Sequence, residues 1–344
     1  MDHTMRRWHL GQFGKQHLQL QTVAIPQPGP GQILVRVAAV ALNYRDKMNI
    51  DNGTGGAQVQ PPFTPASDMA GEVVAVGDGV QRFIAGQRVL STFWGGWLDG
   101  PWPQGTLALG APGPGMLAEY VLLQEDWAVA APLHLTDAQA STLPCAGLTA
   151  WMALVEHGHL HAGQTVVLQG TGGVALFGVQ LAAAHGARTI ILSGDAGKLE
   201  RARALGATHG LLRSQHPEWQ HEVRALTEGR GADHVLELVG GENIGRSLQA
   251  LRQGGRLSVI GLLGDAQLQT SIFPLLLGRH TIQGIGVGHR RALEDLVRAV
   301  DHLRLVPVVE QEYGFAQLPE ALAHLERGPF GKVVVRADRC TKLP

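Results

Sequence analysis

Residues 166–187 read VVLQGTGGVALFGVQLAAAHGA: an apolar run, a group of three glycines and a second apolar run. Residues 165–184 contain no charged side chain. A membrane-spanning helix is nevertheless excluded, because Gly170, Gly172 and Gly173 lie in the middle and the β-branched first half is too short to span a bilayer. The stretch therefore belongs to the interior of a globular fold.

The same stretch predicts a buried parallel strand over 165–169, a glycine turn, and a helix over 174–187 that ends near Gly186. A dinucleotide site needs this order, because glycine lets the backbone approach a pyrophosphate and the helix start supplies free N–H groups. The pattern is Gly170-x-Gly172-x-x-Ala175, with alanine in the third place. Alone it fits a plain structural strand–turn–helix equally well.

The residues that follow repeat the alternation of strand and helix. Strands are expected at 188–193, 209–212, 233–240, 256–264 and 281–287, with helices at 198–207, 217–229 and 243–253. Because the strands are solidly apolar, the pattern predicts an α/β fold with a doubly wound, parallel, six-stranded sheet of Rossmann type. A ligand lies at the carboxyl ends of such strands. The expected cofactor-binding residues there are Gly170, Thr171, Gly172, Gly173, Val174, Ser193, Val239, Gly240, Ile260, Gly261 and Leu262.

Residues 1–128 differ, with short strands such as 32–40 and 70–80 broken by Gly and Pro, which indicates a mostly β domain. A similar strand at 331–336 suggests that the chain returns to that domain. The Gly/Pro-rich stretch 95–115 is expected to form a surface loop. Its alternative role is to rim an apolar substrate mouth, using Trp94, Trp97 and Trp102.

Composition bounds the class of protein. A chain of 344 residues suggests two domains, and 44% hydrophobic with 17% charged residues is typical of a globular protein. A net charge of −1 without basic runs argues against nucleic acid as a partner. The N-terminal stretch lacks the apolar core of a signal peptide, and Cys145 and Cys340 are too few for a disulfide framework. A cytoplasmic location without a membrane partner is expected.

The chain resembles the medium-chain dehydrogenase/reductase superfamily, and most of all its zinc-independent branch, which is quinone oxidoreductase-like and alcohol dehydrogenase-like. The resemblance rests on ALNYRDKMN (41–49), SDMAGEVVAVGDGVQRFIAGQRV (67–89), LAEYV (117–121), TLPCAGLTAW (142–151), QGTGGVALFGVQLAAAHGA (169–187), GGRLSVIGLLG (254–264) and FGKVVVR (330–336). It implies a GroES-like catalytic domain over 1–128 that resumes at 285–344, and a Rossmann cofactor-binding domain over 129–284. It also implies hydride transfer with a nicotinamide cofactor.

Catalytic zinc is not expected. Zinc-dependent relatives carry a Cys, a His and a second Cys, and the corresponding positions here hold Asn43, Ser67 and Cys145. A catalytic zinc needs three protein ligands and an open position, and one thiol beside Asp46 and Asp68 is a poor set. The four closely spaced cysteines of a structural zinc lobe are also missing from residues 90–120. Cys145 is expected to be a small, buried, apolar side chain.

Without a Lewis acid, reduction of an activated acceptor is easier than deprotonation of an alcohol. The expected reaction is therefore NADPH-dependent hydride transfer to a quinone or an α,β-unsaturated carbonyl. The candidate catalytic residues are Asn43, as donor to a carbonyl oxygen, with Tyr44 and Asp46. Packing is the alternative role of Tyr44, and orientation of the backbone or of Arg45 is the expected role of Asp46.

The second Rossmann strand ends at Ser193, where enzymes that use NAD place an acidic residue. Serine does not repel a 2′-phosphate, and Lys198 and Arg213 can supply positive charge, so NADP(H) is favoured over NAD(H). The nearby acidic residue Asp195 argues against NADP(H), unless its role is to cap the next helix. Thr149, Val287 and Lys332 complete the candidate cofactor-binding set.

Two other functions stay open: an alcohol dehydrogenase or ketoreductase of the same superfamily, and an NADPH-binding protein without turnover. The strand at 281–287 is expected at the sheet edge and is unusually apolar, which favours a homodimer formed through it. The alternative is a monomer in which a helix or loop covers this edge.

Overall fold

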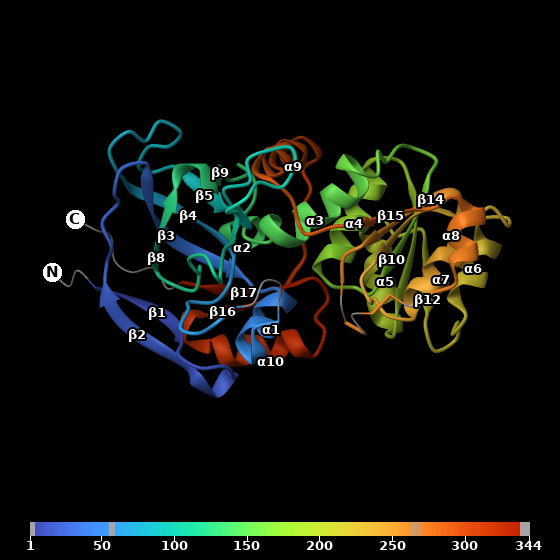
Figure 1. The fold of residues 1–344 in the computed structure, drawn as a ribbon, viewed down its shortest axis with the longest axis horizontal. Coiled ribbons are helices and arrows are strands. Elements are labelled where there is room, and N and C mark those ends of the chain that lie inside the picture. Colours follow the sequence, from blue (N-terminus) through green and yellow to red (C-terminus); the bar gives the residue numbers. More distant parts are fainter. Residues whose placement is uncertain (1–3, 55–58, 262, 265–266, 269, 338–344) are drawn as a thin grey trace. The chain divides into compact units, whose positions relative to one another are not determined.

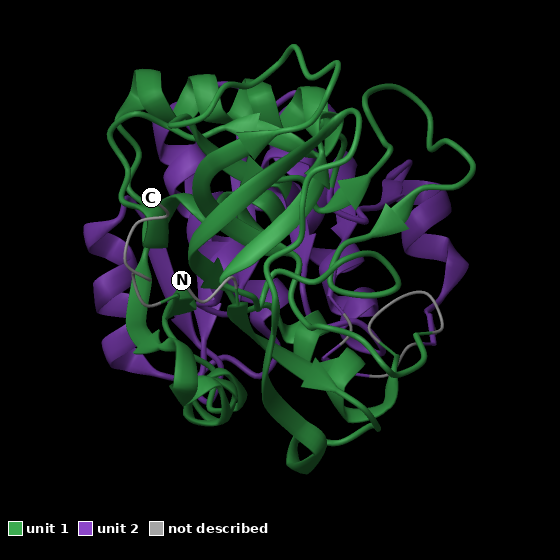
Figure 2. Ribbon diagram, turned by 90° about the vertical axis from the view of Figure 1, so that its left-hand side faces the viewer, with its two compact units in different colours: residues 1–148, 288–344 green, residues 149–287 purple. Residues whose placement is uncertain are grey.

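The computed structural model describes residues 4–54, 59–261, 263–264, 267–268 and 270–337. The chain forms two compact units, residues 1–148 with 288–344 and residues 149–287 (Figure 2). The domain bounds expected at 128/129 and 284/285 remain predictions, and the compact units change at 148/149 and 287/288. Among the described residues, no helix has the length and apolar character needed to cross a membrane.

The 149–287 unit contains a six-stranded parallel sheet in the order β12-β11-β10-β13-β14-β15 (Figure 1). The strands are β10 (Thr165–Gln169), β11 (Arg188–Ser193), β12 (His209–Leu212), β13 (Ala232–Glu237), β14 (Leu251–Val259) and β15 (Thr281–Gly284). Chain order reverses between β10 and β13, which is the point where doubly wound sheets bind their ligands. The predicted α/β fold with a six-stranded parallel sheet is confirmed.

The helices of this unit pack on strands that are buried from end to end, as β10 and β13 are. Val167, Val235 and Leu257 of the sheet share a core with Val223 and Leu248 of the helices. The helical segments are α3 (Leu148–Trp151), η4 (Met152–Glu156), α4 (Gly173–Ala184), α5 (Ala196–Ala204), α6 (Trp219–Leu226), α7 (Asn243–Ala250) and α8 (Ile272–Gly278).

The strand ends differ from the predicted ones at the carboxyl edge of the sheet. β13 ends at Glu237 instead of residue 240, because the N–H groups of Val239 and Gly240 donate to the Glu237 carboxylate, each at 2.9 Å. β14 covers 251–259 instead of 256–264, because the Ile260 and Gly261 N–H groups turn to the Glu237 carbonyl oxygen. The sixth strand is also shorter than predicted and ends at Gly284.

The other unit contains a seven-stranded sheet in which β17, β4 and β8 all pair antiparallel with β3. Two-stranded sheets are formed by β1 with β2 and by β6 with β7. The strands are β1 (Thr4–Leu10), β2 (Leu18–Ala24), β3 (Gln32–Ala41), β4 (Asp68–Val76), β5 (Arg88–Ser91), β6 (Trp94–Gly95), β7 (Leu107–Ala108), β8 (Tyr120–Gln124), β9 (Ala128–Ala130), β16 (Val309–Gly314) and β17 (Lys332–Arg336). The C-terminal strand therefore joins the sheet of residues 1–148, as the sequence predicts.

The helical segments of this unit are mostly short. They are η1 (Lys15–His17), α1 (Tyr44–Asn52), η2 (Glu125–Trp127), α2 (Asp137–Ala140), η3 (Leu143–Gly147, a π-helical turn), α9 (Arg290–Leu303), η5 (Phe315–Gln317) and α10 (Leu318–Glu326).

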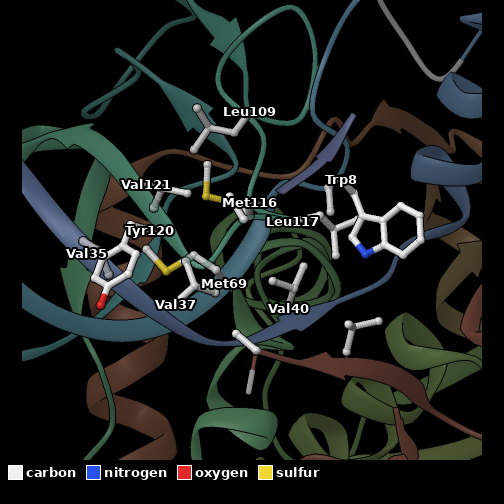
Figure 3. Close-up of a cluster of buried hydrophobic side chains, with 14 of the residues drawn as sticks. Trp8, Val35, Val37, Val40, Met69, Leu109, Met116, Leu117, Tyr120 and Val121 are labelled. Atoms are coloured by element: carbon white, nitrogen blue, oxygen red, sulfur yellow. The ribbon is translucent and has the colours of Figure 1, made fainter. Parts of the chain in front are cut away.

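Figure 3 shows the core of this unit, where Met69 of β4 and Met116 gather with Val37 and Val40 of β3. Trp8 of β1 closes the same cluster, and its indole N–H donates to the Phe315 carbonyl oxygen at 2.8 Å. Because β3 runs through this core and α1 begins only three residues after β3 ends, the core fixes the position from which Asn43 and α1 start.

Candidate functional site

The glycine turn between β10 and α4 leaves space for a ligand. Gly170 has φ +79°, and a Cβ built on Gly170 or Gly172 would meet no described atom within 4 Å beyond its chain neighbours. Gly172 caps α4 without a side-chain hydrogen bond, so the first-turn N–H groups have no intrahelical acceptor. This arrangement of Thr171, Gly173 and Val174 suits a phosphate group.

The end of β11 carries the residues that the sequence predicts to distinguish the two nicotinamide cofactors. Ser193 is buried, its Oγ accepts the Asp195 N–H at 3.1 Å, and its carbonyl oxygen accepts the Arg213 N–H at 2.9 Å. The Arg213 guanidinium lies over Gly194, with Nη2 at 3.0 Å from the site of a Cβ there. Asp195 caps α5 by accepting the Lys198 N–H at 3.0 Å, which is the structural role that the sequence suggests for it.

The ends of β10 and β13 are joined by a buried carboxylate that sequence reasoning missed. Glu237 is 0% exposed and accepts hydrogen bonds from Gln169 (3.0 Å), Asn243 (2.9 Å) and Ser247, besides the Val239 and Gly240 N–H groups. The Gln169 amide oxygen in turn accepts the Leu238 N–H at 3.1 Å. This network sets the course of residues 238–240 by contacts within the protein.

The remaining predicted cofactor residues lie at several places. Gly261 packs so tightly that a Cβ there would lie 2.0 Å from the Leu238 carbonyl oxygen. Val287 has φ +63°, a strained conformation for a β-branched residue and one that is found mostly at functional sites. Thr149 is buried in α3, and Ile260 follows β14. Leu262 lies outside the described residues.

In the other unit, the predicted catalytic residues surround the start of α1. Asn43 is the N-cap of α1 and is 8% exposed, and its N–H donates to Asp46 Oδ2 at 2.8 Å. Asp46 therefore orients this backbone, as predicted. Tyr44 is 44% exposed and lies near Lys47, so it does not pack in the core. Arg45 donates to the Leu109 and Ala111 carbonyl oxygens at 3.0 and 2.8 Å.

Asp68 and Lys332 share one buried cluster with Asn43. Asp68 is 0% exposed, and its carboxylate accepts from Ser67 Oγ at 2.6 Å and from the Cys145 N–H at 3.1 Å. Lys332, which begins β17, is 5% exposed, and its Nζ donates to Asn43 Oδ1 at 2.6 Å and to the Leu42 carbonyl oxygen at 2.5 Å.

Burial governs the ionisation of this cluster. Desolvation is the main cause that raises the pKa of Asp46 to about 6; Arg45 opposes this shift and the nearby Asp68 adds to it. Burial likewise raises the pKa of Asp68, opposed first by the Lys332 ammonium and then by hydrogen bonds. Burial and Asp68 raise the pKa of the Cys145 thiol well above its usual range.

This cluster fits zinc poorly. A zinc-bound cysteine must be a thiolate, whereas the environment of Cys145 disfavours deprotonation. Both oxygens of Asp68 already accept hydrogen bonds, and the Lys332 ammonium adds a positive charge. Within the described ranges, no group of three or more His, Cys, Asp or Glu side chains is arranged to hold a metal. Zinc independence stays a prediction.

Trp94 and the two tryptophans of the 95–115 stretch form one aromatic group. Trp94 and Trp97 lie 4.3 and 4.9 Å from Trp102 between ring centroids, and Trp102 is 50% exposed. Phe93 joins Trp94 at 4.9 Å and lies under the Arg45 guanidinium. Through Phe93, the aromatic group therefore contacts Arg45, which follows Tyr44 in the chain. Its proposed contact with a substrate remains a prediction.

Two known family domains match the sequence: the alcohol dehydrogenase GroES-like domain at residues 29–133 and the zinc-binding dehydrogenase domain at residues 173–302. A zinc-type alcohol dehydrogenase-like protein of Schizosaccharomyces pombe is 36% identical over 336 residues, which are 94% of this chain and 96% of that protein. The chain belongs to the medium-chain dehydrogenase/reductase superfamily.

Other members of the medium-chain dehydrogenase/reductase superfamily resemble this chain over its full length. The quinone oxidoreductase of Rattus norvegicus is 28% identical over 347 residues, covering 96% of this chain and 97% of that protein. The crystal structure of a candidate alcohol dehydrogenase from Sinorhizobium meliloti 1021 is 54% identical, with a TM-score of 0.94 and coverage of 98% and 99%. This medium-chain dehydrogenase/reductase is an oxidoreductase, and members of its family typically bind a nicotinamide cofactor.

Sequence reasoning missed Gln169, Glu237, Asn243 and Ser247 in this medium-chain dehydrogenase/reductase. One signal was available, since a carboxylate at the end of an otherwise apolar strand must find partners when it is buried. The partners of Glu237 could not be identified from the sequence, because Gln169 and Glu237 are 68 residues apart in the chain.

Proposed function

We propose that this protein transfers a hydride from NADPH to an activated carbonyl acceptor, a quinone or an α,β-unsaturated carbonyl, without catalytic zinc. The observation that carries the proposal is the buried amide of Asn43. Its Nδ2 makes no hydrogen bond with acceptable geometry within the described residues, although the amide is close enough to Asp68 to lower the pKa of that carboxyl. A buried donor without a partner is suited to bind a substrate oxygen.

The nicotinamide supplies the hydride when it is bound. The acceptor carbon gains that hydride, and negative charge develops on the acceptor oxygen until a proton arrives. A hydrogen bond from Asn43 Nδ2 stabilises this charge. Tyr44, exposed at the first turn of α1, is the candidate proton donor. The first turn of α4 suits the pyrophosphate that NADPH and NADH share, and the positive charge of Arg213 near Ser193 supports the choice of NADPH.

The proposal is tested by following NADPH oxidation with panels of quinones, enones, aldehydes and ketones, each with and without EDTA. We expect quinones or enones to be reduced at a rate that EDTA leaves unchanged. Asn43→Ala should lower kcat by about 10² to 10³, the range seen when one oxyanion donor is removed. Leu133→Ala, an exposed position of the same unit, serves as control.

An alcohol dehydrogenase or ketoreductase is the second candidate, favoured by the similarity to the Schizosaccharomyces pombe protein and by the matched alcohol dehydrogenase domain. The same panel separates the two, because this candidate requires turnover of aldehydes or ketones and none of quinones and enones. NADPH binding without oxidation by any acceptor would instead establish a non-catalytic binding protein.

We also propose that the protein forms a homodimer. β15 is the edge strand of its sheet, and helix α8, which precedes β15 in the chain and packs on β14, exposes four large apolar side chains: Ile272 (67%), Phe273 (65%), Leu276 (65%) and Leu277 (70%). A contiguous apolar surface beside an unpaired strand is typical of an association site.

A further inference from the structure

We propose that Lys332 is a positioning residue, whose ammonium group fixes the Asn43 amide so that Nδ2, and not Oδ1, is offered to the acceptor oxygen. This inference rests on the proposed function. The two residues lie 289 positions apart and meet because β17 pairs with β3, directly before Asn43. The ammonium is buried, so its hydrogen bonds to Asn43 and Leu42 are made away from bulk water.

The chemistry of the two side chains determines the amide orientation. An ammonium has donors only, whereas a carboxamide presents an acceptor on one side and a donor on the other. With Oδ1 bound to Lys332 Nζ at 2.6 Å, Nδ2 points away from the ammonium. If the amide were flipped, two donors would face each other at this distance, and an acceptor would face the substrate oxygen. Lys332 therefore selects the orientation that can stabilise a developing oxyanion.

The second observation is the orphaned donor itself. Asn43 is 8% exposed, and its Nδ2 is a buried atom that makes no hydrogen bond among the described residues. A buried polar group without a partner is costly, and such groups are found where a ligand completes them. The amide also lies close enough to Asp68 to lower the pKa of that carboxyl, whose two oxygens accept from Ser67 and Cys145 as well.

A double-mutant cycle in the intact protein tests the inference. Lys332→Met removes the ammonium and keeps most of the stem, and it should lower kcat for a quinone or enone acceptor by about 10- to 100-fold, the range of a charge-assisted hydrogen bond. In an Asn43→Ala background the same change should cost less than about threefold. Lys332→Arg, which keeps charge and donors, should recover part of the loss. Fluorescence titration should give NADPH affinity within about threefold of wild type.

Val334→Ala is the matched control, because Val334 lies on the same strand, is fully buried and has an apolar side chain that cannot hydrogen-bond Asn43 or Asp68. It should lower thermal stability and leave kcat unchanged. Equal losses from Lys332→Met with and without Asn43 would overturn the inference while leaving the proposed function intact. So would a loss confined to NADPH affinity, since Lys332 would then be a cofactor ligand. A wild-type protein that reduces no acceptor would overturn the proposed function, and this inference with it.

Discussion

At the residue scale, Arg213 stands beside Ser193, where we propose that the phosphate that distinguishes NADP from NAD binds. We expect Arg213→Ala to weaken NADPH binding roughly five- to fiftyfold, about 1–2 kcal/mol for an exposed charged hydrogen bond, and to leave NADH nearly unchanged. Lys198→Ala should act in the same direction. Fluorescence titration of both cofactors measures the difference.

Arg203→Ala is the control for Arg213, since it removes one exposed positive charge from α5, where Arg203 pairs with Glu200. It should affect the two cofactors equally and weakly. If wild type bound NADH as tightly as NADPH, or if Arg213→Ala weakened both to the same extent, the assignment of NADP(H) would be wrong.

The ionisation of Asp46 should make the stability of the protein depend on pH. Burial raises its pKa to about 6 from an ordinary 3.8, so the folded state favours the neutral acid. Its stabilising contribution is fully present below pH 3.8 and is lost as pH rises through about 6. Relative to Asp46→Asn, wild type should therefore lose roughly 2 kcal/mol of unfolding free energy between pH 4 and pH 7. Urea unfolding across this range measures it.

The asparagine variant is suitable because its amide oxygen can still accept the Asn43 N–H. Asp51→Asn provides a control, since it removes another carboxylate from α1, one that pairs with Lys47 instead of entering the cluster. A difference between wild type and Asp46→Asn that did not change with pH would show that folding does not raise the pKa of Asp46.

At the scale of elements, glycine substitutions in and after the turn between β10 and α4 can test cofactor binding and packing separately. Gly170→Ala places a Cβ in open space but at φ +79°, so it should cost about 1–2 kcal/mol of stability and reduce NADPH affinity by at least tenfold, because the methyl group occupies the phosphate approach. Gly178→Ala is the matched control: its Cβ would lie 2.5 Å from Leu168 Cδ2, inside the unit. It should destabilise the fold without a specific loss of affinity. Calorimetry and titration give both quantities.

The Glu237 network should hold the segment after β13. Glu237→Gln replaces one acceptor oxygen of the carboxylate by an NH2 donor, next to the groups of Gln169, Asn243 and Ser247 that donate to it. We therefore expect the free energy of unfolding in urea to fall by roughly 2–4 kcal/mol. Glu242→Gln, at an exposed position five residues on, should change stability by less than about 0.5 kcal/mol. A tolerated Glu237→Gln would mean that the network does not constrain this segment.

These elements also show what the sequence could predict. The strands around the glycine turn were predictable, because apolar runs of their length and a Gly-x-Gly turn restrict the choice to a strand–turn–helix. The predicted end of β13 is wrong, because the Val239 and Gly240 N–H groups donate to the Glu237 side chain instead of to a neighbouring strand. Asn43 could be proposed from its place in a family motif, but its pairing with Lys332 depends on β17 returning to β3, a long-range contact that local patterns do not encode.

At the scale of the whole molecule, association depends on which backbone groups the edge strand leaves free. The Ile285 N–H donates to the Val259 carbonyl oxygen at 2.9 Å, so Ile285→Pro would damage the sheet and cannot test an interface. Because N–H groups alternate in direction along a strand, the Ile282 N–H points away from β14, toward the open edge. Ile282 is thus the informative position for a proline substitution.

We expect the wild-type chain to have a mass of twice 36.7 kDa by light scattering at micromolar concentration. Ile282→Pro should raise the dissociation constant at least tenfold by removing an edge donor, and Leu277→Asp should do so by placing a charge in the apolar surface of α8, where Leu277 is 70% exposed. Leu133→Asp, at an 88% exposed position in the other unit, is the matched control and should leave the dimer intact. A wild-type monomer would refute the dimer, and a dimer that resists both substitutions would place the interface elsewhere.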